Sequence, residues 1–147
     1  MKLTSRASIQ IQKPIAYVYE GIVNPDFMTK YFISESNGHL ETGVDLLWSF
    51  PEFDGKYPIT KVKVEERKSI SFVWDSETVV HIVLRSQPNN STVVEVTEGS
   101  KVNNVQNLEW LISNTGGWAN FLACMKAYLE HGIQLRKGAY DFLSKSE

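Results

Sequence analysis

The chain has 147 residues, of which 42% are hydrophobic and 22% charged, with a formal net charge of −2. This length and composition are typical of a single globular domain spanning residues 1–147. The longest basic run is Arg67-Lys68, which argues against a surface that tracks nucleic-acid phosphates. No apolar run approaches the roughly 20 residues of a membrane-spanning helix, so we expect no membrane insertion.

The cellular location is predicted from the N-terminus and from cysteine usage. The first 12 residues alternate polar and apolar side chains and lack the apolar core of a signal peptide. The lone Cys124 cannot form an internal disulfide, as is typical of proteins in a reducing compartment. Both features favour a cytoplasmic protein.

The N-terminal part predicts one strand and two short helices. Residues 3–12 alternate polar and apolar side chains, which is typical of a strand with one face in water. Pro14 suits a first helical turn, and Asn24-Pro25 ends that helix. Asn24 or Pro25-Asp26 can then open a second short helix that carries Phe27 to Phe32.

The middle of the chain predicts strands and turns. Gly38 and Gly43 bracket a short strand at 39–41, and a turn is expected at 51–55, which contains the strong turn signal Asp54-Gly55. The stretch 78–85 is nearly continuously β-branched or apolar, so we expect both of its faces to be covered. The other expected strands are 44–50, 57–65, 70–74 and 92–97.

Residues 108–131 predict a long helix, on which the strands would close in an α+β layout. Asn103 or Asn104 can cap its start, and Gly132 suits a left-handed cap at its end. Gly116 and Gly117 are poor helix formers, so we expect a kink or a restart at 114–117, followed by a short helical tail at 133–136 and 140–143. The apolar or spacer positions recur three and four residues apart: Leu108, Leu111, Thr115, Trp118, Leu122, Met125 and Leu129.

Several segments resemble a known family. The segment 114–132, NTGGWANFLACMKAYLEHG, closely resembles the C-terminal helix of the Hsp90-ATPase-activator-homologue-like (AHSA1-type) proteins. These belong to the START-like, SRPBCC helix-grip superfamily, which also includes the birch pollen allergen (Bet v 1-like proteins). The segments 13–18, 25–32, 62–65 and 70–74 support the resemblance.

The resemblance implies an α+β helix-grip fold. In this fold a curved antiparallel sheet wraps around a long C-terminal helix, and two short helices follow the first strand. Superfamily members bind lipids, sterols or polyketides in a cavity between sheet and helix. The co-chaperone that names the family carries a separate N-terminal domain, for which this chain has no room.

The candidate binding residues are mostly aromatic side chains on faces expected to point inward. Large aromatics around a cavity suit an apolar or aromatic ligand, and plain core packing explains any single position equally well. His81, on a strand expected to be buried, can meet a ligand or be a structural histidine. The predicted cavity residues are Tyr31, Phe32, Trp48, Phe50, Phe72, Trp74, His81, Trp118, Phe121, Leu122 and Met125, with Trp118, Phe121, Leu122 and Met125 as the wall on the helix.

We expect a non-catalytic domain that holds a small hydrophobic ligand, such as a lipid, a sterol-like molecule or an aromatic metabolite, without cofactor. The three histidines lack the spacing of zinc ligands, and Glu95, Glu98 and Glu109 form no pair or triad in the sequence. The family resemblance gives an alternative, an Hsp90-type chaperone accessory or stress-related interaction module. A cyclase/aromatase-like enzyme is a second alternative. The chain could be a monomer or a homodimer.

Overall fold

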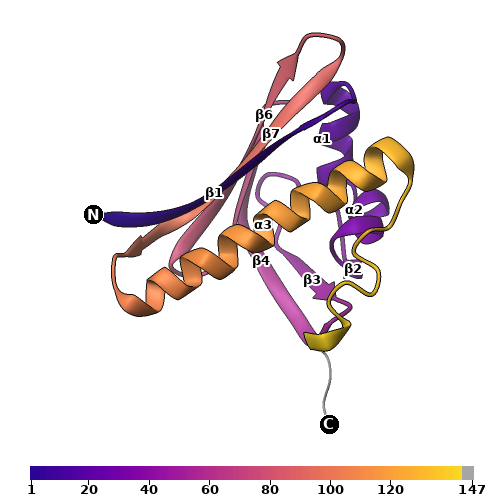
Figure 1. Cartoon of the computed structure of the whole chain (residues 1–147). Coiled ribbons are helices and arrows are strands. Elements are labelled where there is room, and N and C mark those ends of the chain that lie inside the picture. The colour runs from indigo at the N-terminus through magenta and orange to yellow at the C-terminus, as the bar shows by residue number, and fades with distance from the viewer. Residues whose placement is uncertain (144–147) are drawn as a thin grey trace.

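A computed structural model describes residues 1–143, which form a seven-stranded antiparallel sheet and three α-helices (Figure 1). The strand order across the sheet is β1-β7-β6-β5-β4-β3-β2. The elements in chain order are β1 (Lys2–Ile11), α1 (Ile15–Val23), α2 (Pro25–Tyr31), β2 (Glu35–Ser36), β3 (Leu46–Phe50), β4 (Phe53–Glu65), β5 (Ser69–Asp75), β6 (Thr78–Gln87), β7 (Ser91–Val102), α3 (Val105–His131) and the 3-10 helix η1 (Asp141–Leu143).

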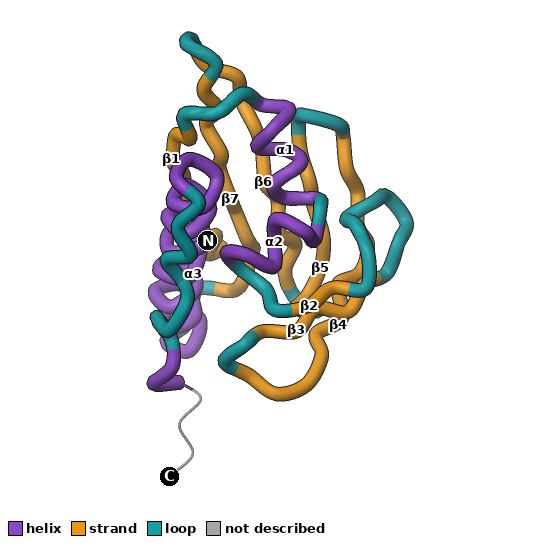
Figure 2. Tube along the Cα trace, turned by 90° about the vertical axis from the view of Figure 1, so that its right-hand side faces the viewer, coloured by secondary structure: helices purple, strands orange, loops and turns teal. Residues whose placement is uncertain are grey.

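The three α-helices lie on one side of the strongly curved sheet (Figures 1 and 2). The helix α3 runs diagonally across this side, and α1 and α2 lie beside its C-terminal half (Figure 1). The inward residues of the strands are buried against the helices, and the outward ones are mostly in contact with water. The helix-grip fold expected from the sequence is therefore confirmed.

The long helix begins and ends where the sequence predicts. The Asn104 side chain accepts a hydrogen bond from the Asn107 N–H at 2.8 Å, which satisfies one of the free donors of the first turn. Gly132 ends the helix with a φ of 68°, a left-handed conformation that glycine adopts without a Cβ clash.

The predicted restart of the helix at 114–117 is wrong, because α3 continues through these residues. Asn114 and Thr115 do not cap a new helix: Asn114 donates to Glu98, and the Thr115 hydroxyl lies 3.1 Å from that of Ser5 on β1. The glycines that follow face open space. Tertiary anchoring thus outweighs a local propensity penalty of about 1 kcal/mol per glycine.

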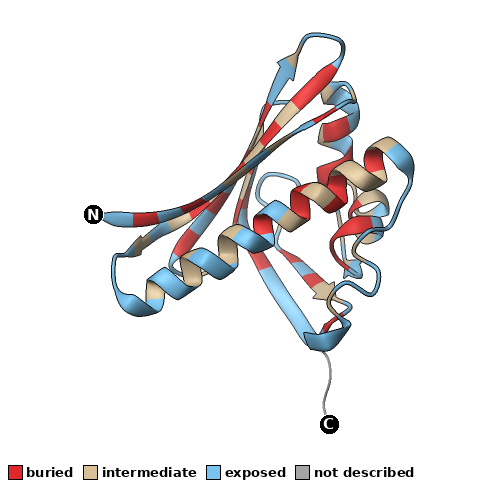
Figure 3. Cartoon of the chain, in the orientation of Figure 1, coloured by how far each residue is buried: buried red, intermediate tan, exposed pale blue. Residues whose placement is uncertain are grey.

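Only the second half of α3 is buried. Figure 3 shows exposed residues along its first turns and buried ones from its middle onward. Of the predicted apolar stripe, Leu108 is exposed and Trp118 is the first fully buried member. The N-terminal half therefore contributes little to the core.

In the middle of the chain the strand predicted at 39–41 is wrong, and the turn predicted at 51–55 is shorter than expected. The segment 39–41 is a loop, because the Leu40 N–H donates to the Val23 carbonyl at the end of α1 instead of to a strand. The β3–β4 turn lies at 51–52, where Phe50 pairs with Phe53, and Gly55 lies within β4 with a φ of 88°. The hairpin is therefore tighter than Asp54-Gly55 predicts.

The expected burial of both faces at 78–85 is also wrong. The side chains of β6 alternate between buried and exposed, and Val79 and His81 lie on the outer face, which no helix covers. The tail differs as well: residues 133–136 are not helical, and a 3-10 helix forms only at Asp141–Leu143.

Candidate functional site

The space between the sheet and α3 is filled by aromatic rings. Phe32, which follows α2, has its ring centroid 4.6 Å from that of Phe121 and 5.9 Å from that of Trp48. These pairs are edge-to-face, the geometry in which aromatic contacts are most favourable. Five of the predicted cavity residues are core residues no more than 1% exposed, and they line none of the hollows described below: Trp48, Phe72, Phe121, Leu122 and Met125.

A buried carboxylate organises one end of this core. Glu98 on β7 is 1% exposed. Its Oε1 accepts hydrogen bonds from Asn114 Nδ2 and Trp118 Nε1, both at 3.0 Å. Its Oε2 accepts from Thr78 Oγ1 at 2.7 Å and Trp74 Nε1 at 3.0 Å. The donors come from β5, β6 and α3, so one side chain joins the helix to the sheet.

The four donors occupy the hydrogen-bonding capacity of the carboxylate, which offers about four lone-pair sites. Full pairing of this kind compensates for burying the group. Because both indole N–H groups point at Glu98, the rings of Trp74 and Trp118 stack, with centroids 5.3 Å apart and planes at 23°. Glu98 therefore fixes the orientation of two tryptophans whose rings line a groove.

This aromatic groove lies between α3, the β3–β4 hairpin and the C-terminal segment. It consists of two hollows of about 440 and 390 Å³ that share Phe53, Trp74 and Arg136. Aromatic rings form most of its walls, and Gly117 leaves room along the helix. Its residues are Phe32, Phe50, Phe53, Tyr57, Trp74, Trp110, Ser113, Asn114, Gly117, Trp118, Arg136, Tyr140 and Leu143.

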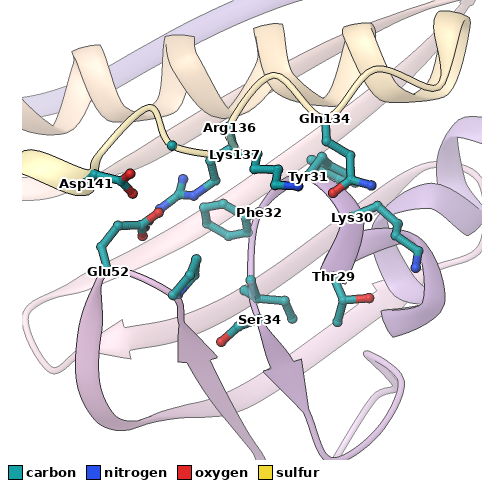
Figure 4. Close-up of a pocket in the computed structure, with 13 residues that line it drawn as sticks. Thr29, Lys30, Tyr31, Phe32, Ser34, Glu52, Gln134, Arg136, Lys137 and Asp141 are labelled. Carbon is teal, nitrogen blue, oxygen red and sulfur yellow. Dashed lines mark hydrogen bonds and ion pairs between the residues drawn. The ribbon is translucent and has the colours of Figure 1, made fainter. Parts of the chain in front are cut away.

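A second, polar hollow of about 430 Å³ lies on the other side of Arg136 (Figure 4). Glu52 and Asp141 approach it from one side, and Gln134 and Lys137 lie along its upper edge in this view. The remaining lining comes from α2 and the residues after it, and from Pro51 and Gly138. Because acidic and basic side chains both line it, the polar hollow has no strong preference for one sign of charge.

Arg136 lines both the aromatic groove and the polar hollow. Its Nη2 donates to Glu52 Oε1 at 2.8 Å, and the two side chains are 15% and 6% exposed. Its guanidinium carbon lies 4.9 Å from the ring centroid of Tyr140 and 5.6 Å from that of Phe32, within the range of cation–π attraction. Its Nε is buried and has no hydrogen-bond partner among residues 1–143.

Two titratable groups near Arg136 are held in their neutral forms. Burial raises the pKa of the Tyr140 phenol and of the Cys124 thiol, and the Arg136 guanidinium opposes each shift only in part. Loss of a proton from either group would place a new negative charge in a poorly hydrated environment. Cys124 is therefore a packed thiol and not an activated nucleophile.

The structure brings together only some of the predicted site residues. Phe32, Phe50, Trp74 and Trp118 line the aromatic groove, and Tyr31 and Phe32 line the polar hollow. His81 is exposed on the outer face of the sheet, so the prediction that it faces the cavity is wrong.

Sequence reasoning missed Glu98, Arg136 and Glu52 as site residues. For Glu98 a signal was available: the alternation of Val94 and Val96 on β7 places Glu98 on the inward face. Arg136 and Glu52 are 84 residues apart and belong to irregular segments, where no periodicity predicts their orientation.

The curved sheet, the two short helices and the long C-terminal helix define the fold, which is a helix-grip fold of the START-like, SRPBCC type. No protein-family model and no curated protein sequence matches the chain. Solved structures do match. A Staphylococcus saprophyticus protein is similar with 27% identity and a TM-score of 0.81, over 91% of this chain and 96% of that one.

Two further solved structures with a similar fold are described as Aha1 or AHSA1-like. The Aha1 dimer from Colwellia psychrerythraea has 20% identity and a TM-score of 0.75, over 88% of this chain and 98% of that one. The AHSA1-like protein from Aeromonas hydrophila has 20% identity and a TM-score of 0.63, over 86% and 93%. The chain thus has an AHSA1-like fold, as the sequence resemblance implies.

Residues 1–143 lack two other kinds of feature, a membrane-spanning helix and a metal-binding cluster. None of the helices in this part of the chain is both long enough and apolar enough to cross a membrane. The same residues contain no group of three or more histidine, cysteine or acidic side chains placed to hold a metal ion.

Proposed function

We propose that this domain binds a small, flat, apolar molecule in the aromatic groove without transforming it. The observation that carries the proposal is the groove itself, whose lining is mostly aromatic and includes Trp74, Trp118 and Tyr140. The hollow of about 440 Å³ is within the 300–1,000 Å³ typical of ligand sites. Burying about 200 Å² of apolar ligand surface there would contribute about 5 kcal/mol.

The chemistry of the walls favours an aromatic ligand over a lipid or a sterol-like molecule. The indole N–H groups of Trp74 and Trp118 are turned toward Glu98, so the tryptophans present faces and edges to a ligand. Ring surfaces of this kind gain most from another flat ring. Glu98 is already bonded to four donors, which supports binding over acid–base catalysis of the cyclase/aromatase kind.

Two glycines offer a matched test. A Cβ at Gly116 or Gly117 meets no atom within 4 Å, but only Gly117 lines the groove. Gly117→Leu fills the groove, and Gly116→Leu adds the same side chain outside it. Binding of the apolar dye N-phenyl-1-naphthylamine, followed by its fluorescence, should weaken at least tenfold in Gly117→Leu and stay unchanged in Gly116→Leu. Absence of dye binding to the wild type, or equal affinity in all three proteins, would overturn the proposal.

A separate observation favours a second candidate function, protein interaction. An exposed apolar strip runs along the start of α3 and consists of Val102, Val105, Leu108 and Ile112. Val102, just before the helix, is 58% exposed, and the three helical residues are 73%, 43% and 74% exposed in that order. The helical residues are three and four apart and therefore share one face. The dimeric state of the Colwellia psychrerythraea Aha1 structure supports a second copy of this chain as the occupant of the strip.

Sedimentation velocity across a concentration series tests this second function. The wild type should dimerise, and Ile112→Asp should be monomeric because it places a charge on the most exposed residue of the strip. Ile133→Asp, at an apolar residue that is 53% exposed outside the strip, is the control. A monomeric wild type, including one that instead binds an Hsp90-type chaperone in a pull-down, would reject the homodimer.

A further inference from the structure

One residue that lines the groove, Arg136, carries a buried donor without a hydrogen-bond partner among residues 1–143. Among the described residues, Arg136 Nε is the only buried side-chain nitrogen or oxygen without a hydrogen-bond partner. An unpaired buried donor destabilises the folded state, and more so on a charged group. Arg136 lines both hollows of the aromatic groove, so a molecule bound there contacts this side chain.

The surroundings of Arg136 define the acceptor that would satisfy it. Glu52 already neutralises the guanidinium at 2.8 Å, and Asp141 lines the same polar hollow beside Arg136 (Figure 4). A ligand carboxylate in the aromatic groove would bring a second negative charge to a guanidinium that Glu52 already pairs, among aromatic rings that provide little solvation. A neutral oxygen acceptor carries no such penalty.

From this we propose that Arg136 is the specificity-determining residue of the site, and that it selects a neutral aromatic molecule bearing a carbonyl oxygen over a hydrocarbon or an aromatic acid. The inference rests on the proposed function and adds the ligand class. The ligand ring lies against Trp74 and Tyr140, and its carbonyl accepts the Nε–H. Because Nε is buried, Arg136 turns the Nε side of its guanidinium toward the groove when the ligand binds. Its Nη2 keeps the hydrogen bond to Glu52.

Three naphthalenes of matched shape test the proposal by isothermal titration calorimetry on the full chain. They are 2-acetylnaphthalene, with a neutral carbonyl, 2-isopropenylnaphthalene, with a methylene in place of that oxygen, and 2-naphthoate, with a carboxylate. The wild type should bind the ketone at least tenfold more tightly than the alkene, as expected for one hydrogen bond from a charged donor. The naphthoate should bind more weakly than the ketone.

Arg136→Met keeps an apolar stem of similar length and removes the donor. The ketone and the alkene should then bind equally, with little change for the alkene. Arg136→Lys keeps the positive charge without the Nε–H and should also lose the preference. Because Arg136→Met leaves Glu52 buried without its partner, the double variant Glu52→Gln/Arg136→Met is measured as well. Arg85→Met, at an arginine on β6 whose side chain is 51% exposed, is the control.

The outcomes separate the two proposals. If no naphthalene binds and the dye does not bind either, the proposed function fails. If ketone and alkene bind the wild type equally, or the naphthoate binds most tightly, the role assigned to Arg136 is overturned while groove binding stands. Retention of the ketone preference in both the Arg136→Met and the double variant would also overturn that role.

Discussion

The most informative single change is Glu98→Gln, which keeps the size of the side chain and replaces one acceptor oxygen by an NH₂ group. In either orientation the new NH₂ faces two former donors. On the Oε2 side these are Thr78 and Trp74, and on the Oε1 side Asn114 and Trp118. A hydroxyl or an amide can turn and accept, but an indole N–H cannot. One tryptophan is therefore left without an acceptor.

The magnitude follows from these contacts. A buried donor without a partner costs about 1–3 kcal/mol, and hydrogen bonds to a neutral acceptor are each about 1 kcal/mol weaker than those to a charged one. Relief from burying a charge offsets part of this loss. We expect Glu98→Gln to lower the free energy of unfolding by about 2–4 kcal/mol, which leaves a typical domain folded.

Urea denaturation followed by far-UV circular dichroism measures this loss without relying on tryptophan emission, which the change itself will alter. Glu95→Gln is the matched control on the same strand. Glu95 pairs with Arg6 and Arg85 at the surface, so its replacement should cost no more than about 1 kcal/mol.

A double-mutant cycle tests whether Glu98 is coupled to the two indole N–H groups. Trp74→Phe and Trp118→Phe each remove one indole N–H. At least one of them should cost about 1–3 kcal/mol less in the Glu98→Gln protein than in the wild type, because it removes the donor that has lost its acceptor. If both replacements are additive with Glu98→Gln within about 0.5 kcal/mol, the carboxylate does not hold the tryptophans as described.

Three further predictions concern stability. Burial raises the pKa of Glu130, but hydrogen bonds from the Gln12 N–H and Lys126 outweigh it and hold that pKa below its ordinary 4.5. The stabilisation of the folded state by ionised Glu130 is therefore present above pH 4.5 and is lost as pH falls through the folded-state pKa. Urea titrations should show Glu130→Gln about 1 kcal/mol less stable than the wild type at pH 7, and this difference in free energy of unfolding should shrink in acid. A difference that does not change with pH would contradict the role assigned to the Glu130 carboxylate. Gly132→Ala should lower the free energy of unfolding by about 1 kcal/mol, measured by thermal unfolding, because a Cβ is unfavourable at a φ of 68°. Gly132→Asn should lose less, because asparagine adopts this left-handed conformation more readily. Asn104→Ala should cost about 1 kcal/mol through loss of the N-cap, and Asn104→Asp should retain the stability.

The sequence predicts the fold well where hydrophobic periodicity is strong. The alternation in β1 and the three-four spacing in α3 gave the correct element types, and the caps at Asn104 and Gly132 gave the correct helix ends. These features depend on residues close together in the chain, whose spacing determines the face on which they lie.

Predictions fail where tertiary contacts override local preference. The glycines at 116 and 117 favour a restart of the helix, but α3 continues through them and the Asn114 side chain is held by Glu98 on the sheet. His81 lies in a run of apolar residues that resembles a fully buried strand, although only one face of β6 meets the helices. The family resemblance implies a cavity between the sheet and the long helix, but Trp48 and Phe121 are core residues no more than 1% exposed.

The aromatic groove has two walls of different origin. One wall consists of Trp74 on the sheet and Trp118 on α3, and hydrogen bonds to the buried Glu98 hold both side chains. Arg136 and Tyr140 come from the segment after α3, which contributes few buried residues. Changes at Tyr140 and its exposed neighbours in that last segment can therefore reshape one wall of the groove while leaving the core intact, so this wall can vary, naturally or by design, with little loss of stability.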